Sequence, residues 1–230
     1  MIDIYTWPTP NGHKIHIMLE ETGTPYKVHA INIRAGDQFQ PQFLQISPNN
    51  RIPAIVDSDG PGGKPISLFE SGAILIYLAA KTGKFLPNDL HTRYTALQWL
   101  MWQMGGVGPM FGQANHFRGY SKEKLDYPIE RYTNESNRLT NVLDKRLGEA
   151  AYLAGEEYSI ADMAVFPWMR GSDRRGVNLN EYPNVTRWFD AINARPAVQR
   201  ALQVLADKQG APLDDKARDV MFGATQFARR

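Results

Sequence analysis

The sequence predicts an α/β domain followed by an all-helical domain. Residues 1–86 alternate short β-branched runs with helical spacing and turn residues, whereas from Thr92 onward apolar residues recur only at helical spacing. A short linker that contains Pro87 separates the two patterns. We therefore predict a mixed domain at 1–86, a helical domain at 92–210 and a tail at 211–230, which a chain of 230 residues can accommodate.

The first domain is expected to follow the order βαβ and then ββα. Its first helix repeats apolar residues at helical spacing from Ile15 and ends at Gly23, a favourable C-terminal cap. A glycine-rich turn joins the last two strands as a hairpin, and Ser71 is expected to cap the helix that ends before Gly83. This order is the thioredoxin-like arrangement. The expected strands cover residues 2–5, 26–33, 54–57 and 66–69, and the other helices cover residues 40–45 and 71–81.

The second domain is expected to be a bundle of helices. Gly105, Gly106, Gly108 and Pro109 are expected to break the chain after its first helix. Ser159 and Asp162 have the spacing of an acidic capping box, which starts another helix. The polar tail beyond Gly210 is expected to be mobile unless its few apolar residues dock. The helices are expected at residues 94–104 and 127–147, after Ser159, and around Trp188.

Composition excludes several classes of function. The net charge is +2, and the first 85 residues hold seven basic and seven acidic residues, which is unlike the clustered charge of a nucleic-acid surface. The N-terminus resembles no signal peptide, and no apolar run approaches the ~20 residues that span a bilayer. We therefore expect a cytoplasmic protein without a membrane segment. The chain has no cysteine, which excludes disulfides and a thiolate nucleophile of its own. His13 and His16 share a helix face but lack a third metal ligand at suitable spacing, so no metal is expected.

Two motifs at strand ends carry the functional prediction. Ile52-Pro53 precedes a strand, where a cis bond would expose the Ile52 backbone; a trans bond that ends a loop is the commoner alternative. Glu70-Ser71 lies between a strand and a helix, where helix N–H groups attract a carboxylate and Glu70 attracts an ammonium. Together they suit the head group of an α-amino acid. A routine cap with a solvated glutamate is the alternative.

These motifs resemble a known family. The segments Ser47–Ile55 and Phe69–Ile74 resemble the glutathione-binding half of the glutathione transferases, and Ser159–Asp162 resembles the capping box of their helical domain. The segments Pro8–Lys14, Gly36–Phe39 and Glu130–Tyr132 are similar to the bacterial nu class, which are glutathione-dependent disulfide-bond oxidoreductases. That class is itself similar to the globular part of a fungal nitrogen-regulatory prion protein. The resemblance covers residues 1 to about 205 and implies a homodimer.

The resemblance implies a glutathione site. The Ile52 backbone, beside Pro53, would pair with the cysteinyl segment, and Glu70 and Ser71 would hold the γ-glutamyl amino and carboxylate groups. Gln38 and Arg51 would reach the other end or a second glutathione. Arg131 would contact glutathione, in this site or the neighbouring subunit's; an exposed helical arginine paired with Glu135 is the alternative.

The sulfur of glutathione also needs hydrogen-bond donors. The resemblance to the nu class places Thr9 and Asn11 there, as the catalytic residues, and the helix N-terminus adds positive potential. Tyr5 is the rival, because tyrosine-type transferases carry their catalytic residue at the end of the first strand. We favour Tyr5 as a packed strand aromatic. Trp7, Phe111 and Phe117 are candidates for a second-substrate pocket.

The function expected from these observations is the reduction of small disulfides through a bound glutathione thiolate. A protein without cysteine needs the tripeptide to supply the sulfur. One alternative is glutathione conjugation to electrophiles, or peroxide or ether cleavage. Another is a non-catalytic regulatory module with the same fold.

Overall fold

The computed structural model describes residues 1–209 and 213–228. The chain forms two compact units, which we call the sheet unit (residues 1–77 with the described part of 200–230) and the helical unit (residues 78–199). Residues 211, 212, 229 and 230 of the expected tail lie outside the described residues. The domain boundaries at residues 86, 92 and 210 stay a prediction, because a compact unit is not by itself a domain that folds alone.

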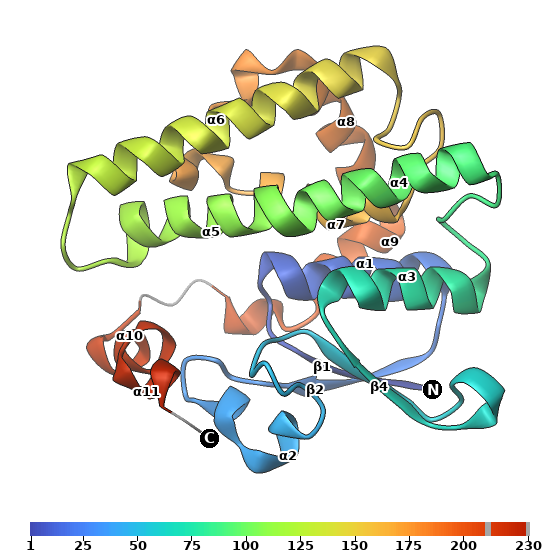
Figure 1. Ribbon diagram of the computed structural model, residues 1–230, viewed down its shortest axis with the longest axis horizontal. Coiled ribbons are helices and arrows are strands. Elements are labelled where there is room, and N and C mark those ends of the chain that lie inside the picture. Colours follow the sequence, from blue (N-terminus) through green and yellow to red (C-terminus); the bar gives the residue numbers. More distant parts are fainter. Residues whose placement is uncertain (210–212, 229–230) are drawn as a thin grey trace. The chain divides into compact units, whose positions relative to one another are not determined.

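The sheet unit is built on a mixed sheet of order β2-β1-β3-β4 (Figure 1). Strand β2 is parallel to β1, and β1–β3 and β3–β4 are antiparallel, which confirms the expected hairpin. Ile2, Ile4 and Thr6 alternate as the buried residues of β1, and Thr6 bonds to His16 on α1. The strands are β1 (Ile2–Thr6), β2 (Tyr26–Ala30), β3 (Ala54–Asp57) and β4 (Ile66–Phe69), and the helices up to residue 82 are α1 (Pro10–Thr22), α2 (Pro41–Leu44) and α3 (Ser71–Thr82).

Two element boundaries of the sheet unit differ from the prediction by more than one residue. Strand β2 ends three residues early, because Asn32 turns the chain: its N–H donates to Asp37 and its side chain accepts from the Arg34 N–H. Helix α1 begins at Pro10, five residues before Ile15, where the helical spacing of apolar residues begins. Proline is favourable in the first helical turn, where its missing N–H has no partner to lose.

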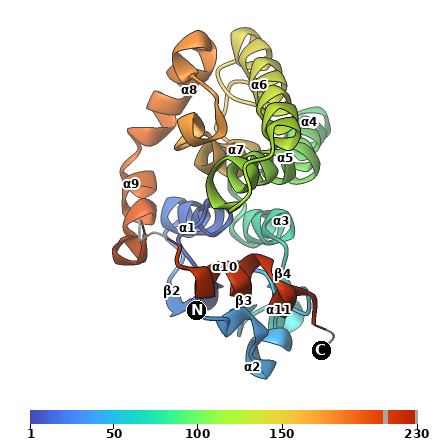
Figure 2. The ribbon, with the colours of Figure 1, turned by 90° about the vertical axis from the view of Figure 1, so that its left-hand side faces the viewer.

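The C-terminal segment belongs to the sheet unit and is helical. After α9 (Pro196–Gln203), the chain forms α10 (Asp215–Phe222) and α11 (Ala224–Phe227). Figures 1 and 2 show α10 and α11 beside the sheet, close to α2. Residues 213–228 are thus largely helical, and Asp214 caps α10 by accepting from the Ala217 N–H; whether the tail is mobile stays a prediction.

The helical unit departs from prediction at the glycines. Gly105, Gly106 and Gly108 do not break the chain: residues 103–107 form one π-helical turn between α4 and α5, and a second follows at 116–120. A widened turn lets Pro109 follow without interrupting the helix, since the proline ring cannot meet an ordinary hydrogen-bond partner. The helices are α4 (Leu90–Trp102), α5 (Gly108–Asn115), α6 (Asp126–Glu149), α7 (Ile160–Met169) and α8 (Pro183–Asn193).

The predicted capping box is present at the start of α7. The Ser159 side chain accepts from the Ala161 N–H, and Asp162 accepts from the Ser159 N–H. Asp162 also accepts from the Leu153 N–H and from the indole N–H of Trp188, which joins α7 to α8. Every residue of α7 is buried, so this helix is the centre of the helical unit. Across residues 1–209 and 213–228, none of the helices has the length and apolar character needed to cross a membrane.

Candidate functional site

Four connecting segments of the sheet unit begin or end at the same edge of the sheet. Tyr5 near the end of β1 pairs with Ala54 at the start of β3, and Ala54 pairs with Phe69 at the end of β4. Ala30 at the end of β2 pairs with Thr6. The register therefore brings together the segments that carry Thr9, Gln38, Ile52-Pro53 and Glu70-Ser71. Sequence patterns located these strand ends, but only the register shows that they meet.

Thr9 is the N-cap of α1. Its Oγ accepts from the Gly12 N–H at 3.3 Å, and Asn11 follows in the first helical turn. A Cβ on residue 12 would collide with the Trp7 carbonyl, so Gly12 is needed for this tight start. A hydroxyl that accepts one hydrogen bond still has a proton to donate. The first turn of α1 thus offers a hydroxyl, an amide side chain and a helix N-terminus to an anion.

The Ile52–Pro53 peptide bond is cis. The commoner trans alternative is therefore wrong. Ser47 braces the preceding loop, because its buried Oγ donates to the Arg51 carbonyl at 2.8 Å and accepts from the Arg51 N–H. This loop leads directly into β3 at the common edge of the sheet.

Glu70 lies exposed at the joint between β4 and α3 with φ +67°. This left-handed conformation costs a non-glycine residue roughly 1–2 kcal/mol. Such strain is concentrated at functional sites. The Glu70 carboxylate accepts one hydrogen bond from Asn49, at 3.4 Å. Helix α3 begins at Ser71 itself, so the cap position falls on Glu70, one residue earlier than expected.

Lys14 on α1 contacts the candidate site residue Ser71, a neighbour that the sequence analysis missed. Its Nζ donates to Ser71 Oγ at 3.1 Å, and the side chain is only 1% exposed. Burial lowers its pKa to about 7, while the negative charge of Glu70 acts in the opposite direction. The signal in the sequence was a lysine on a helix that otherwise buries apolar residues from Ile15 to Leu19.

Gln38 and Arg51 have different surroundings. Gln38 is 3% exposed, donates to the Ile33 carbonyl, and its Oε1 has no hydrogen-bond partner in the structure. Arg51 is exposed, and its Nη1 donates to Asn50 and, at 3.0 Å, to Gln226 on α11. The C-terminal segment, about 175 residues away in sequence, therefore reaches the predicted site.

Tyr5 lies on the other face of β1 from Thr6. Its ring stacks on His29 with centroids 4.6 Å apart and also meets Phe43 of α2. Burial, with Asp3 nearby, raises its pKa. A tyrosine in this position packs against the sheet, and a raised pKa weakens it as a proton donor. Trp7, in the turn before Thr9, is buried.

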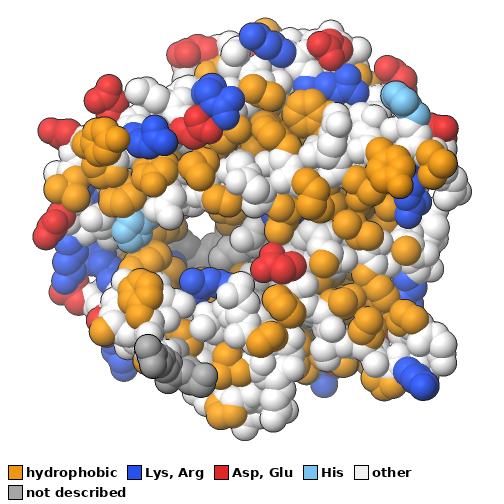
Figure 3. All heavy atoms as spheres, in the orientation of Figure 1, with side chains coloured by type: hydrophobic (Ala, Val, Ile, Leu, Met, Phe, Trp, Pro, Cys, Tyr) orange, Lys and Arg blue, Asp and Glu red, His pale blue; other side chains and the backbone are white. Residues whose placement is uncertain are grey.

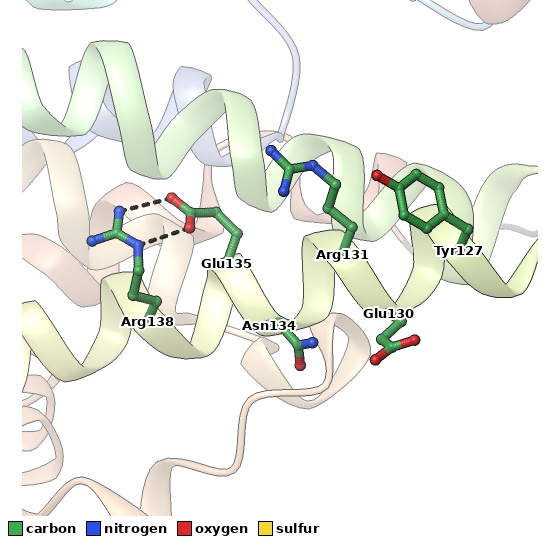
Figure 4. A pocket seen from close by; sticks show the side chains of 6 residues that line it. All are labelled: Tyr127, Glu130, Arg131, Asn134, Glu135 and Arg138. Atoms are coloured by element: carbon green, nitrogen blue, oxygen red, sulfur yellow. Dashed lines mark hydrogen bonds and ion pairs between the residues drawn. The ribbon is translucent and has the colours of Figure 1, made fainter.

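The remaining candidates lie in the helical unit. Phe111 is fully buried with the Arg175 guanidinium over its ring, whereas Phe117 is half-buried and stacks on Tyr132. Arg131 lies on the exposed face of α6, over a pocket of about 340 Å³ (Figure 4). Arg138, and not Arg131, forms the hydrogen-bonded ion pair with Glu135. The pocket is lined by Tyr127, Glu130, Arg131, Asn134, Glu135 and Arg138.

No group of three or more His, Cys, Asp or Glu side chains among the described residues could hold a metal ion. The sheet edge instead combines an anion, a buried cation and two helix N-termini within one unit. Such a set can hold a peptide with an ammonium, a carboxylate and a thiolate.

Comparisons with known proteins agree on a family. The model of the glutathione S-transferase N-terminal domain matches residues 2–80, and that of the C-terminal domain matches residues 108–196. The disulfide-bond oxidoreductase YfcG of Escherichia coli is 52% identical over 203 residues, which span 88% of this chain and 94% of that protein.

Solved structures give the same result. A glutathione transferase family member from Pseudomonas fluorescens, with two glutathione bound, is 49% identical and has a TM-score of 0.84. The match covers 88% of this chain and 92% of that one. A glutathione transferase from Pseudomonas putida, with one glutathione disulfide bound per subunit, is 47% identical with a TM-score of 0.85, at 89% and 91% coverage.

Proposed function

The chain belongs to the glutathione transferase family, and from that premise we propose that it is a glutathione-dependent oxidoreductase that reduces small disulfides. One observation carries the proposal: a sheet edge suited to a charged thiol peptide occurs in a chain that has no cysteine. The sulfur chemistry must then come from the bound peptide. The name of the E. coli relative and the glutathione disulfide in the P. putida structure support this reading.

The residues receive the following roles. Thr9 and Asn11 donate to the glutathione thiolate, which α1 stabilises through its N-terminus. The Ile52 backbone pairs with the cysteinyl segment. Glu70 binds the γ-glutamyl ammonium and Ser71 its carboxylate. Gln38 and Arg51 serve the glycyl end or a second glutathione.

The reaction proceeds in two exchanges. The first glutathione thiolate attacks one sulfur of the substrate disulfide, forms a mixed disulfide and releases one substrate thiolate. A second glutathione thiolate attacks the glutathione sulfur of the mixed disulfide, which gives glutathione disulfide and releases the other substrate thiolate. Both released thiolates take protons from water. The protein orients the reactants and stabilises the attacking thiolate. The P. fluorescens structure, which has two glutathione bound, supports a site that holds both glutathiones.

We also propose a homodimer in the cytoplasm, where glutathione is kept reduced. Helix α4 presents Leu90, Tyr94 and Met101 to solvent, and Figure 3 shows apolar side chains gathered over the face that carries α4 and α5. Arg131 would then serve glutathione in its own or the partner's site. Light scattering is expected to give twice the chain mass for the wild type and a smaller mass for Tyr94→Glu; a monomeric wild type would contradict the dimer.

The test compares disulfide reduction with conjugation, and it compares Thr9 with Tyr5 as the hydrogen-bond donor to the glutathione sulfur. We expect turnover of 2-hydroxyethyl disulfide with glutathione and little conjugation to a chlorinated nitrobenzene. Thr9→Ala should lower disulfide turnover about tenfold or more, the effect of losing one charge-assisted hydrogen bond. Thr9→Ser should retain most of it, and Tyr5→Phe should match the wild type. Equal activity of Thr9→Ala and the wild type would contradict the assignment of Thr9 as a donor to the glutathione thiolate. Tight glutathione binding without turnover in either assay would favour the regulatory module.

A further inference from the structure

Lys14 carries the one fully buried lysine side chain among the described residues. Lysine is almost never fully buried unless its charge is paired, because removing an ammonium from water is costly. The residues around it on α1, from Gly12 to Leu19, are buried as well. A lysine in such a place needs a reason other than packing.

One hydrogen-bond partner of the ammonium is the hydroxyl of Ser71, at the start of α3. Lys14 Nζ donates to Ser71 Oγ over 3.1 Å, across 57 positions of sequence. A hydroxyl that accepts from an ammonium must direct its own proton elsewhere, and the positive charge makes it a stronger donor. The contact therefore turns Ser71 into a polarised donor at the site that the proposed function gives to the γ-glutamyl carboxylate.

Charged and titratable groups near Lys14 come from two elements. Glu70, at the joint before α3, favours the charged lysine, and burial opposes it, which leaves the pKa of Lys14 near 7. On α1 itself, His16 bonds to Thr6 and stays neutral because burial lowers its pKa to about 3. His13 bonds to Gln209. A ligand carboxylate next to Ser71 would thus decide the charge of Lys14.

We propose that Lys14 is a positioning residue for glutathione, which supplies the positive charge that the γ-glutamyl carboxylate receives through the Ser71 hydroxyl. This inference rests on the proposed glutathione site. A protonated Lys14 directs the Ser71 proton outward to the carboxylate, whereas a neutral amine can accept that proton and turn the hydroxyl inward. Binding of the carboxylate is therefore linked to protonation of Lys14.

The linkage has a measurable sign. Where Lys14 is already charged, below about pH 7, binding needs no proton and is strongest. Above that pH the free protein must take up a proton to bind, so affinity falls, by at most about tenfold per pH unit. Binding near about pH 8 is then accompanied by proton uptake.

The experiment uses S-methylglutathione, whose blocked sulfur removes the thiol titration. Calorimetry from about pH 6 to about pH 9, in buffers of different ionisation enthalpy, gives the affinity and the protons taken up by the wild type. Lys14→Met should bind about tenfold more weakly at low pH and lose the part of the pH dependence that belongs to Lys14. The ligand's own amino group titrates in the same way with the wild type and with Lys14→Met. The difference between the two proteins therefore gives the contribution of Lys14. Lys14→Arg should keep most of the affinity without that pH dependence.

Two controls separate a positioning role from a structural one. Lys27→Met removes an exposed lysine of β2 and should leave affinity and proton uptake unchanged. In a double-mutant cycle, Lys14→Met should add little to Ser71→Ala, because both act through one hydroxyl. Thermal unfolding confirms that the variants fold.

The outcomes distinguish the two proposals. Proton uptake by the wild type beyond that of Lys14→Met, together with non-additivity, supports the role of Lys14. If the wild type takes up no more protons than Lys14→Met when it binds S-methylglutathione, or if Lys14→Met has the same affinity at every pH, the role of Lys14 is refuted and the glutathione site stands. If the wild type binds no S-methylglutathione at any pH, the glutathione site itself is refuted, and the role of Lys14 with it.

Discussion

The starts of helices α3 and α7 use the same residue types in opposite ways. At α7 the Asp162 carboxylate is fully buried and accepts hydrogen bonds from Leu153, Ser159 and Trp188. At α3 the Glu70 carboxylate is exposed, accepts one long bond from Asn49, and sits on a left-handed backbone. A satisfied carboxylate stabilises a fold, whereas an exposed one with spare capacity is available to a ligand. We interpret the difference as that between a structural helix start at α7 and the proposed binding one at α3.

The largest effect on stability should come from removing the hydrogen-bonded Asp162 carboxylate at the start of α7. Asp162→Ala leaves several buried donors without an acceptor, so we expect a loss of about 4 kcal/mol in the free energy of unfolding. Urea denaturation measures it. Glu157→Ala, an exposed neighbour in the same loop, should change stability by less than about 0.5 kcal/mol. A loss as small for Asp162→Ala would show that the capping box does not stabilise the helical unit.

Replacing Lys14 should stabilise the protein, in contrast to replacing Asp162, because the burial of the Lys14 ammonium costs stability. Its pKa is 10.5 in the unfolded chain and about 7 in the folded protein. Between these values the unfolded chain binds more protons, so wild-type stability should rise with pH; below about 7 the full cost is present. Lys14→Met should therefore stabilise the free protein, by on the order of 2 kcal/mol more at about pH 6 than at about pH 9.

The measurement is thermal or urea unfolding of both proteins across that range of pH, without ligand. Lys27→Met, at an exposed position, supplies the matched control and should give no pH-dependent difference. A constant difference between wild type and Lys14→Met would mean that Lys14 titrates alike in folded and unfolded chains.

Glu70 separates backbone strain from side-chain function. Glu70→Gly relieves the left-handed backbone, and the gain exceeds the entropy cost of glycine by about 0.5–1 kcal/mol. The same change removes the carboxylate, so the affinity for S-methylglutathione should fall about tenfold. Stability and binding thus move in opposite directions, as measured by urea unfolding and calorimetry.

Two related variants sharpen this result. Glu70→Ala keeps the strained backbone and should lose affinity without the gain in stability. Ser67→Gly, on the extended backbone of β4, should lose about 0.5–1 kcal/mol. Full affinity in Glu70→Gly would contradict the assignment of Glu70 to the ligand ammonium.

Local signals predicted most of the fold. The hairpin, the capping box and the glycine that ends α1 each depend on residues a few positions apart, and all are present. The contacts that were missed join distant residues: Lys14 to Ser71, and Arg51 to Gln226. The π-helical turn at 103–107 was missed because glycine and proline near a helix indicate a break, while packing decided that the helix continues.

The smallest effect tests whether the C-terminal segment competes for the site. Gln226 accepts from Arg51 in an exposed hydrogen bond and donates to Asn50 in a half-buried one, so Gln226→Ala should change stability by only about 0.5 kcal/mol. If Arg51 serves the glycyl carboxylate, this bond must open before the ligand binds. Gln226→Ala should then tighten S-methylglutathione binding about twofold. Thr225→Ala is the matched control, because its hydroxyl bonds to Asp219. In an Arg51→Ala background Gln226→Ala should have no effect; tightening there would show that α11 acts on the site by another route.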